Sequence, residues 1–466
     1  MEELSRRAKR FTIVATILGS SIVFVDSTVV NVALPAIQND LGGGLAAQQW
    51  IVDAYLLTLG SLILVGGSLG DIFGDVRVFM IGVVSFGVAS ALCAAAPTST
   101  ALIVCRGLQG VAGALLTPAS LAILTSTFSG TERGSAIGTW TAWSGISFVI
   151  GPLLGGWLIG AWTWRAIFLI NVPVAAITFA FTYREVPRVA PGRRGVRVDY
   201  PGAALCAAGL GSLVLGLIEQ PRRGWGDPVV VLAIVLGAAC LVAFVAYESR
   251  APQPMLPLRL FSKRNFSVTN LETFAVYGGL ASWLFLLSLF LQQLGGWTAL
   301  QAGAATLPVT IGMFLLSRFA GRYSMRYGPR WFMAAGPAVA GVSALALARI
   351  PTDPQYAADL LPGLLGFAVG LSLTVAPLTT TVLSEAGPAD AGIASGVNNA
   401  VARVAGLMAV AAVGLVAAGG ADHLTAPGYR DGMILTALLL FAGGAIGAVG
   451  IRNPRGQETA ESAALS

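Results

Sequence analysis

Long apolar runs almost free of charged residues recur from one end of this 466-residue chain to the other. Each run is long enough to cross the roughly 30 Å hydrocarbon core of a bilayer as an α-helix. Charged residues make up 11% of the chain, against about 25% in an ordinary soluble domain. A soluble protein of this size could not cover its surface with so few charges. The sequence therefore predicts an all-α integral membrane protein rather than a soluble enzyme with an anchor.

The apolar runs divide into fourteen predicted transmembrane segments. The first contains Asp26 and has no small-residue cleavage pattern behind it, so we expect it to be kept as a helix rather than removed as a signal peptide. The predicted limits are 11–37, 47–69, 78–96, 100–127, 135–160, 166–183, 201–218, 228–247, 266–293, 300–317, 331–349, 358–383, 391–418 and 432–451.

The distribution of lysine and arginine orients these segments. With the N-terminus in the cytoplasm and strict alternation, 21 of the 28 basic residues fall in cytoplasmic segments and five in external ones. Positive charge accumulates on the cytoplasmic side of multi-pass proteins. Both termini are therefore predicted to be cytoplasmic. The net charge of +6 then reflects membrane topology, and no nucleic-acid partner is expected.

The two longest cytoplasmic loops, residues 184–200 and 248–265, bracket the seventh and eighth segments. This predicts an N-terminal six-helix bundle over 1–190, a two-helix insert over 191–257, a C-terminal six-helix bundle over 258–451 and a cytoplasmic tail over 452–466. Paired six-helix bundles are a common design of secondary transporters, with the substrate site near the midplane between them. No GxxxxGK[ST] nucleotide motif occurs, and the cysteines have no CxxC spacing, so neither ATP nor a metal is expected.

Several short motifs follow one another along the predicted helices. They are DSTVVNVALP (26–35), GSLGDIFGDVR (67–77), RGLQG (106–110), GPLLGG (151–156), WR (164–165), NVP (171–173) and GIASG (392–396). In this order and at these helices they resemble the 14-helix branch of drug:proton antiporters in the major facilitator superfamily. The resemblance covers nearly the whole chain and implies the major facilitator fold. It also implies a non-enzymatic, proton-coupled exporter of amphipathic drugs or antibiotics, cationic ones included, that works by alternating access without a cofactor.

The GPLLGG motif places small residues at helical spacing. Gly151, Gly155 and Gly156 leave one helix face without side chains, which lets another helix approach closely, and Pro152 permits a bend. The resemblance implies a tight, bendable contact between the two halves that closes the cytoplasmic side, and it favours antiport over uptake. Ordinary helix packing is the alternative interpretation.

The 67–77 motif is predicted to be a short turn between the second and third helices. The resemblance implies that it forms a charged contact between the two halves, using Gly67, Asp71, Gly74 and Arg77. A carboxylate is favourable beside a helix N-terminus. Ile72 and Val76 stand where the family pattern is basic, so this contact is expected to be weakened.

Five charged residues lie at membrane depth, where each charge costs roughly 2.5–3.5 kcal/mol or more and so normally faces a cavity or a partner. Asp26, near the midplane, is expected to exchange protons or bind substrate, because burial disfavours its charged form. A structural charge capped by Ser27 or Thr28 is the alternative. Asp53 and Arg106 are expected to form an ion pair beside Asn31.

The second half carries the other two deep charges, Glu272 and Arg403. Their depths let long side chains meet, as a structural pair or as part of a proton relay. The proton-coupling candidates are thus Asp26, Asp53, Arg106 and Glu272. The substrate-cavity candidates are Asn31, Tyr55, Trp143, Asn398, Asn399 and Arg403.

Three other functions compete with drug export. The first is dedicated export of one endogenous metabolite, lipid or siderophore. The second is proton-coupled uptake, which the GPLLGG motif disfavours. The third is a membrane sensor or membrane enzyme, and no catalytic triad or metal cluster supports it. The expected partners are the lipid bilayer of the cell membrane, a small-molecule substrate and protons, with the chain acting as a monomer.

Overall fold

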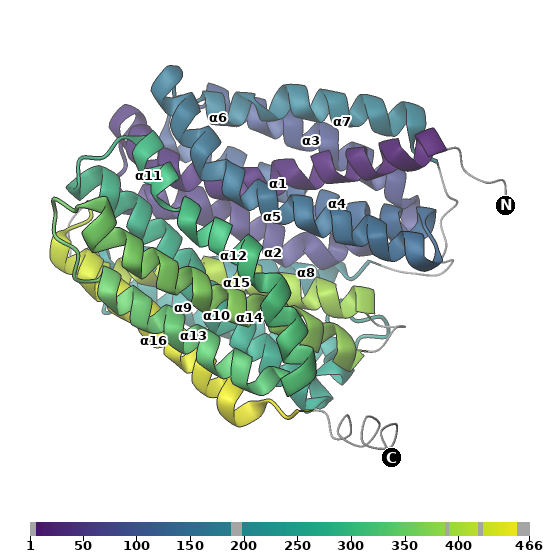
Figure 1. Ribbon diagram of the computed structural model, residues 1–466. Coiled ribbons are helices and arrows are strands. Elements are labelled where there is room, and N and C mark those ends of the chain that lie inside the picture. The colour runs from purple at the N-terminus through teal and green to yellow at the C-terminus, as the bar shows by residue number, and fades with distance from the viewer. Residues whose placement is uncertain (1–5, 188–197, 387–390, 418–422, 454–466) are drawn as a thin grey trace, which may run out of the picture.

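The computed structural model describes residues 6–187, 198–386, 391–417 and 423–453, and every regular element in these ranges is helical (Figure 1). The first half holds α1 (Arg6–Leu41), α2 (Gly44–Phe73), α3 (Asp75–Ala95), α4 (Ser99–Thr127), α5 (Gly130–Ala161), α6 (Ala166–Leu169) and α7 (Asn171–Glu185). Next come α8 (Tyr200–Arg223) and α9 (Pro228–Glu248). The second half holds η1 (Leu258–Ser262), α10 (Arg264–Leu289), η2 (Phe290–Leu294), α11 (Ala299–Ala305), α12 (Leu307–Tyr327), α13 (Pro329–Leu347), η3 (Tyr356–Leu360), α14 (Leu361–Ala386), α15 (Ala391–Ala417) and α16 (Ala426–Gly450).

Thirteen stretches of the described chain are long and apolar enough to cross a membrane as helices. The predicted segment at 135–160 lies within α5, a 32-residue helix whose described apolar part, Ile150–Ala161, is shorter than a span. The all-helical, multi-pass character predicted from the sequence is therefore confirmed.

Proline divides two of the predicted segments. The segment at 300–317 consists of α11 and α12, and Pro308 stands in the first turn of α12, where a missing N–H costs nothing. This helix runs to Tyr327, ten residues beyond the predicted limit. The prediction ended with the apolar stretch, whereas the helix continues through the arginine-containing residues that follow it. The segment at 166–183 is likewise divided into α6 and α7, with Pro173 in the first turn of α7.

The helices α8 and α9 pack against each other, and α8 also lies against α2 and α15. Leu210, Val214 and Ile218 of α8 form one apolar cluster with Leu407 and Ala411 of α15. By contrast α9 is the most hydrophobic span, with a mean hydropathy of 3.1, and most of its side chains are exposed. An exposed, uniformly apolar helix is suited to face lipid.

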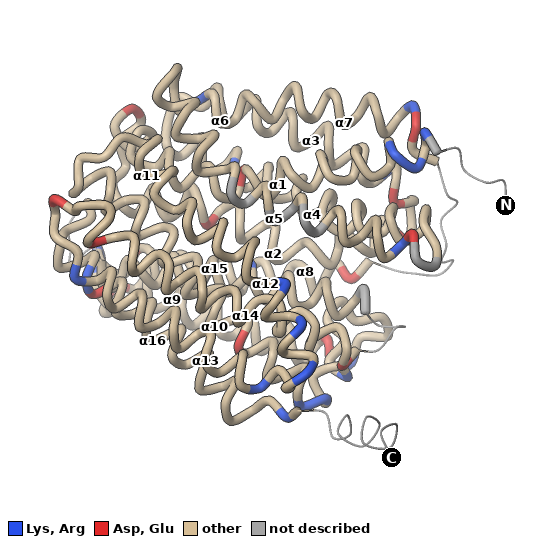
Figure 2. Tube along the Cα trace, viewed as in Figure 1, with Lys and Arg blue, Asp and Glu red and all other residues tan. Residues whose placement is uncertain are grey.

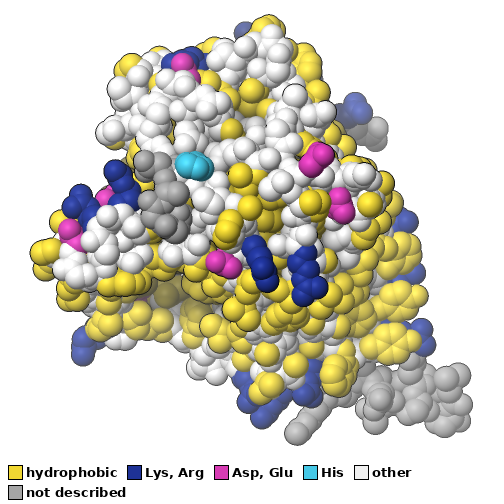
Figure 3. All heavy atoms as spheres, turned by 90° about the vertical axis from the view of Figure 1, so that its left-hand side faces the viewer, with side chains coloured by type: hydrophobic (Ala, Val, Ile, Leu, Met, Phe, Trp, Pro, Cys, Tyr) yellow, Lys and Arg dark blue, Asp and Glu magenta, His cyan; other side chains and the backbone are white. Residues whose placement is uncertain are grey.

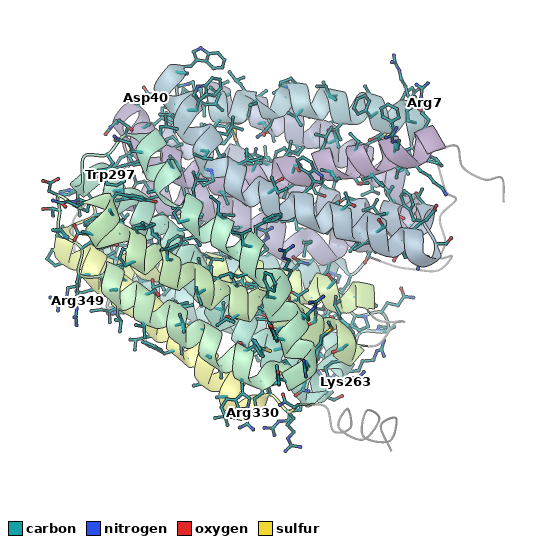
Figure 4. All side chains as sticks on the ribbon, in the orientation of Figure 1. Arg7, Asp40, Lys263, Trp297, Arg330 and Arg349 are labelled. Atoms are coloured by element: carbon teal, nitrogen blue, oxygen red, sulfur yellow. The ribbon has the colours of Figure 1, made fainter. Side chains whose placement is uncertain are left out.

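The two ends of the helix bundle differ in charge. Lys and Arg gather at the end that carries Arg7, Lys263 and Arg330, which we call the basic end (Figures 2 and 4). Asp40, Trp297 and Arg349 lie at the opposite end, here called the far end, whose surface carries acidic as well as basic side chains (Figure 3). This asymmetry agrees with the charge count along the sequence.

The two halves meet along α2 and α15 and, toward the far end, along α1 and α10. On α2, the Gln49 amide donates to the carbonyl oxygen of Val410 on α15, at 2.7 Å. Between α1 and α10, the Ser288 hydroxyl donates to the Asn31 carbonyl oxygen at 3.0 Å. Nearer the far end, the Gln293 amide donates to the Gln38 side-chain oxygen at 3.0 Å. The halves are therefore joined at the far end by polar bonds as well as by apolar packing.

Candidate functional site

Two of the buried charges form an ion pair inside the first half. Arg106 on α4 donates through Nη1 to the Asp26 carboxylate on α1, and the two side chains are 1% and 0% exposed. The guanidinium also donates through Nε to the Ile51 carbonyl oxygen of α2 at 3.0 Å. Its other face lies over the Tyr55 ring, 4.2 Å from the centroid. Arg106 is thus held by acceptors on α1 and α2 and by the Tyr55 ring.

Two amides complete the coordination of Asp26. The Gln109 and Asn171 side chains donate to the same carboxylate oxygen at 2.8 and 3.0 Å, and both also reach the Ser90 hydroxyl. Gln109 and Asn171 were not among the predicted site residues, although both lie within motifs already singled out. Gln109 follows Arg106 by three residues, so one helix face presents both. Asn171 stands at the break between α6 and α7.

The prediction that Arg106 pairs with Asp53 is wrong. Arg106 lies against the face of α2 that carries Tyr55. Asp53 is two residues earlier, about 200° around the helix at 3.6 residues per turn. Its side chain therefore points away from Arg106. Asp26 takes the partner that was predicted for Asp53, so its carboxylate is compensated by Arg106 rather than capped by Ser27 or Thr28.

Asp53 is fully buried, and among the described residues neither of its carboxyl oxygens has a hydrogen-bond partner. Its neighbours on the same face of α2 are Gln49, one turn before, and Gly60, two turns after. Gln49 bonds to α15, and a Cβ on Gly60 would lie 3.2 Å from the Cβ of Arg403 on α15. Asp53 therefore lies on the side of α2 that packs against the second half.

Glu272 and Arg403 do not meet, so the predicted pair is absent. The Glu272 carboxyl is 0% exposed, and neither oxygen has a hydrogen-bond partner in the part of the chain that the structure describes. A Cβ on Gly447 would lie 2.9 Å from Glu272 Oε2 and 2.7 Å from the Met333 carbonyl oxygen, which places Glu272 between α10, α13 and α16. Arg403 instead faces the first half, 5.6 Å from the centroid of the Phe24 ring on α1. The two charges lie on different sides of the second half.

The remaining cavity candidates, Tyr55, Asn31 and Trp143, differ in their burial and in their contacts. Tyr55 is fully buried and donates to the Val23 carbonyl oxygen at 3.1 Å, so it packs within the first half rather than lining a cavity. Asn31 is 5% exposed at the contact between α1 and α10. Trp143, on α5, is 47% exposed.

The two neighbouring asparagines on α15 differ in their hydrogen bonds. Asn398 donates to the Thr273 hydroxyl of α10 at 2.8 Å and so joins two helices of the second half. Asn399 is exposed and donates to the Ser395 carbonyl oxygen of its own helix. Of the polar residues predicted on α15, Asn399 and Arg403 remain accessible, whereas Asn398 is committed to a structural bond.

The GPLLGG motif makes close contacts, as predicted. A Cβ on Gly155 would lie 2.6 Å from the Val29 side chain of α1, and one on Gly156 would lie 2.5 Å from the Leu300 Cα of α11. In return, a Cβ on Gly303 of α11 would overlap the Pro152 carbonyl oxygen. The motif therefore joins the two halves. The contact lies near the C-terminal end of α5, at the far end, which the charge count assigns to the outside. The cytoplasmic side predicted for this contact does not agree with its position.

The 67–77 segment is not the loop predicted from the sequence. Helix α2 continues through Phe73, and the turn is confined to Gly74, whose φ of 91° is a left-handed value that favours glycine. Asp71 and Arg77 are exposed, and within the described residues neither forms an ion pair. A Cβ added to Gly67 would lie 3.7 Å from the Pro118 side chain of α4. The charged contact between halves is thus absent from this conformation.

A family comparison decides what kind of protein carries this arrangement. Residues 16–410 match the family model described as Major Facilitator Superfamily. The chain belongs to the major facilitator superfamily. It is accordingly a multi-pass membrane protein of a transporter family, as the sequence motifs predicted.

Several curated members of the superfamily are similar over most of their length. The puromycin resistance protein pur8 of Streptomyces alboniger is 36% identical over 93% of this chain and 88% of its own. The methylenomycin A resistance protein of Bacillus subtilis (strain 168) is 35% identical over 88% of this chain and 87% of its own. The cephamycin export protein CmcT of Amycolatopsis lactamdurans is 33% identical over 90% and 88%.

Solved structures of other transporters share the fold. An auto-inhibited POT family peptide transporter superposes with a TM-score of 0.69 over 97% of this chain and 98% of its own, at 17% identity. The inward-open xylose transporter XylE from E. coli gives a TM-score of 0.65 over 97% and 98%, at 13% identity. At such identities the likeness concerns the fold alone.

Proposed function

We propose that this chain is a proton-coupled exporter of amphipathic drugs or antibiotics. The observation that carries the proposal is similarity over nearly the whole chain to proteins named for resistance to, or export of, puromycin, methylenomycin A and cephamycin. Supporting it, uncompensated carboxyls lie inside the membrane-spanning helices, where ionisable groups serve proton relays and substrate pathways. The proton gradient is the energy source, and the chain works in the cell membrane as a monomer without a cofactor.

The architecture that we propose has fourteen transmembrane helices, with α5 as the fourteenth and both termini in the cytoplasm. The six-helix bundles extend over 1–190 and 258–451, the two-helix insert over 191–257 and the cytoplasmic tail over 452–466. The basic end then faces the cytoplasm, and the contacts of α5 with α11 and of α1 with α10 lie on the external side. In this conformation the external side is the closed one.

Transport by membrane vesicles tests the direction and the energy source. Everted vesicles that contain the protein, energised to be acidic inside, should accumulate amphipathic fluorescent compounds such as ethidium or dansyl-leucine more than tenfold over vesicles without it. An uncoupler should release them, because an antiporter exchanges internal protons for the compound. Accumulation of the same compounds only by right-side-out vesicles would instead show uptake, and accumulation that survives the uncoupler would exclude proton coupling.

Within this function, we assign the proton to Asp53. An ionised carboxylate that is buried without a partner is very unfavourable, so the neutral acid is the form that fits this conformation. Asp26, in contrast, accepts three hydrogen bonds, one of them from Arg106, and so is already compensated inside the first half. Asp53 also lies where α2 packs against α15, so a movement of the two halves changes its surroundings directly.

The variant Asp53→Asn tests this assignment, because asparagine mimics the neutral acid permanently. We expect gradient-driven accumulation to fall more than tenfold, while exchange of labelled for unlabelled compound without a gradient stays within about twofold. The control is Asp431→Asn, an exposed residue of α16. Unchanged accumulation by Asp53→Asn would remove Asp53 from the proton pathway and leave Asp26 or Glu272 as the carrier.

A dedicated exporter of one endogenous metabolite, lipid or siderophore is the second candidate. Such an exporter would also give gradient-driven accumulation in the vesicle assay, but for a narrower range of compounds. A resistance panel in an efflux-deficient host separates the two, because a dedicated exporter protects against one compound class only.

A further inference from the structure

One deep charge of this protein differs from the other four in being accessible. Asp26, Asp53, Arg106 and Glu272 are all 0–1% exposed. Arg403 is partly exposed. Its nitrogen atoms form no hydrogen bond or ion pair in the part of the chain that the structure describes, and they are not among its enclosed, unpartnered atoms. The guanidinium is therefore an uncompensated cation that is not fully enclosed.

The surroundings of Arg403 place it between the two halves. Its Cβ lies against Gly60 of α2, at 3.2 Å from an added Cβ, and its guanidinium extends over the Phe24 ring of α1. Both contacts are with the first half, although α15 belongs to the second. Tyr55 and Tyr277 are near enough to interact with it electrostatically, and both are neutral phenols. None of these four neighbours supplies a negative charge.

The carboxylates of the same region cannot neutralise Arg403 in this conformation. Asp26 is held by Arg106 and two amides inside the first half. Glu272 is enclosed between α10, α13 and α16. Asp53 is fully buried two turns from Gly60 along α2. A cation at membrane depth normally faces a partner, and here the missing partner is an anion.

We propose that Arg403 is a substrate-binding residue that recognises an anionic group, such as a carboxylate, on an amphipathic compound. An arginine fork donates two parallel N–H···O bonds to a carboxylate, and the neighbouring Phe24 ring offers apolar surface for the rest of the molecule. The inference rests on the proposed export function and refines it, because it replaces cationic drugs by amphipathic monoanions as the preferred substrates.

Binding to the purified full-length protein in lipid nanodiscs tests the proposal without any gradient. The probes are dansyl-leucine, an amphipathic monoanion, and its carboxamide, which has the same size and no charge, with empty nanodiscs as background. Wild type should bind the acid at least tenfold more tightly than the carboxamide. Arg403→Gln should weaken binding of the acid at least tenfold and leave the carboxamide within about twofold. Arg403→Lys keeps the charge and should retain most of the preference.

Two controls keep the result interpretable. Arg349→Gln, at the far end, removes an arginine outside the proposed site and should change neither affinity. Each variant must elute as wild type does in size-exclusion chromatography. Arg403→Met, which also removes the charge, replaces Arg403→Gln as the diagnostic variant if the latter fails this check, with the same loss of preference for the acid expected. Equal affinity of wild type for acid and carboxamide, no binding of the acid, or an unchanged preference in Arg403→Gln would overturn the proposal.

The vesicle assay separates this proposal from the function on which it rests. A protein that binds the acid through Arg403 but accumulates no compound contradicts export and supports the binding site. A protein that accumulates ethidium in a gradient-dependent manner but binds no acid supports export and contradicts the assignment of Arg403.

Discussion

Replacing Arg106 by methionine is expected to destabilise the protein by about 3–5 kcal/mol, because it leaves the Asp26 carboxylate buried without its counter-charge. No water can compensate, since both side chains are enclosed. The methionine also gives up the bond to the Ile51 carbonyl oxygen and the contact with the Tyr55 ring. Transport should fall more than tenfold, because the network joins four helices of the first half and a fifth through Ser90.

A double-mutant cycle isolates the ion pair from these other losses. Asp26→Asn removes the negative charge while keeping an oxygen for Gln109 and Asn171. In the double variant Asp26→Asn/Arg106→Met the uncompensated charge is gone, so it should be clearly more stable than Arg106→Met alone. The measurement is unfolding by SDS in mixed micelles. Effects that add to within about 0.5 kcal/mol would mean that Asp26 and Arg106 do not interact.

The second large effect is expected at the contact between α5 and α11. A Cβ on Gly303 would overlap the Pro152 carbonyl oxygen, and one on Gly156 would lie 2.5 Å from the Leu300 Cα. These are backbone atoms, which cannot move aside as a side-chain tip does. Gly303→Leu or Gly156→Leu should therefore push the two halves apart at the far end. We expect transport to fall more than tenfold, since the conformation closed at this end becomes inaccessible.

Spin labels at Trp162 and Arg349 report this separation, because both residues lie at the far end and belong to different halves. In a background without the four native cysteines, the distance distribution of Gly303→Leu should shift to longer values than that of the parent. Gly160→Ala is the matched control on α5, since nothing lies within 4 Å of its added Cβ. An unchanged distribution in Gly303→Leu would show that the contact does not hold the far end closed.

Much of the fold could be predicted because membrane insertion constrains a sequence locally. A span needs a run of apolar residues long enough to cross the bilayer, and such runs are visible without any knowledge of their neighbours. The limits failed where helices continue past the apolar stretch, as α12 does to Tyr327, and where Phe73 extends α2 through a predicted loop. Hydropathy marks the membrane-embedded part of a helix, not its hydrogen-bonded end.

The candidate site was predicted residue by residue but not pair by pair. All five deep charges stood out, because a charge within an apolar run is rare and costly. Their partners did not, since depth along a helix can be counted but the rotation of one helix against another cannot. Asp53 and Ile51 are only two residues apart on α2. Of the two, it is Ile51 that contacts Arg106, through its backbone carbonyl oxygen. Gln109 and Asn171 were missed because uncharged amides are common in helices.

The sequence alone thus determined that this is a multi-pass helical transporter of the major facilitator superfamily, how its basic residues divide between two ends and which charges lie deep in the membrane. Only the tertiary structure decided that Asp26 takes Arg106, that Asp53 and Glu272 have no partner and that Arg403 stays accessible between the halves. The reason is physical. Burial in a bilayer is dictated by each segment's own composition, whereas the pairing of charges depends on which helix faces meet, and that is fixed by the packing of all the helices together.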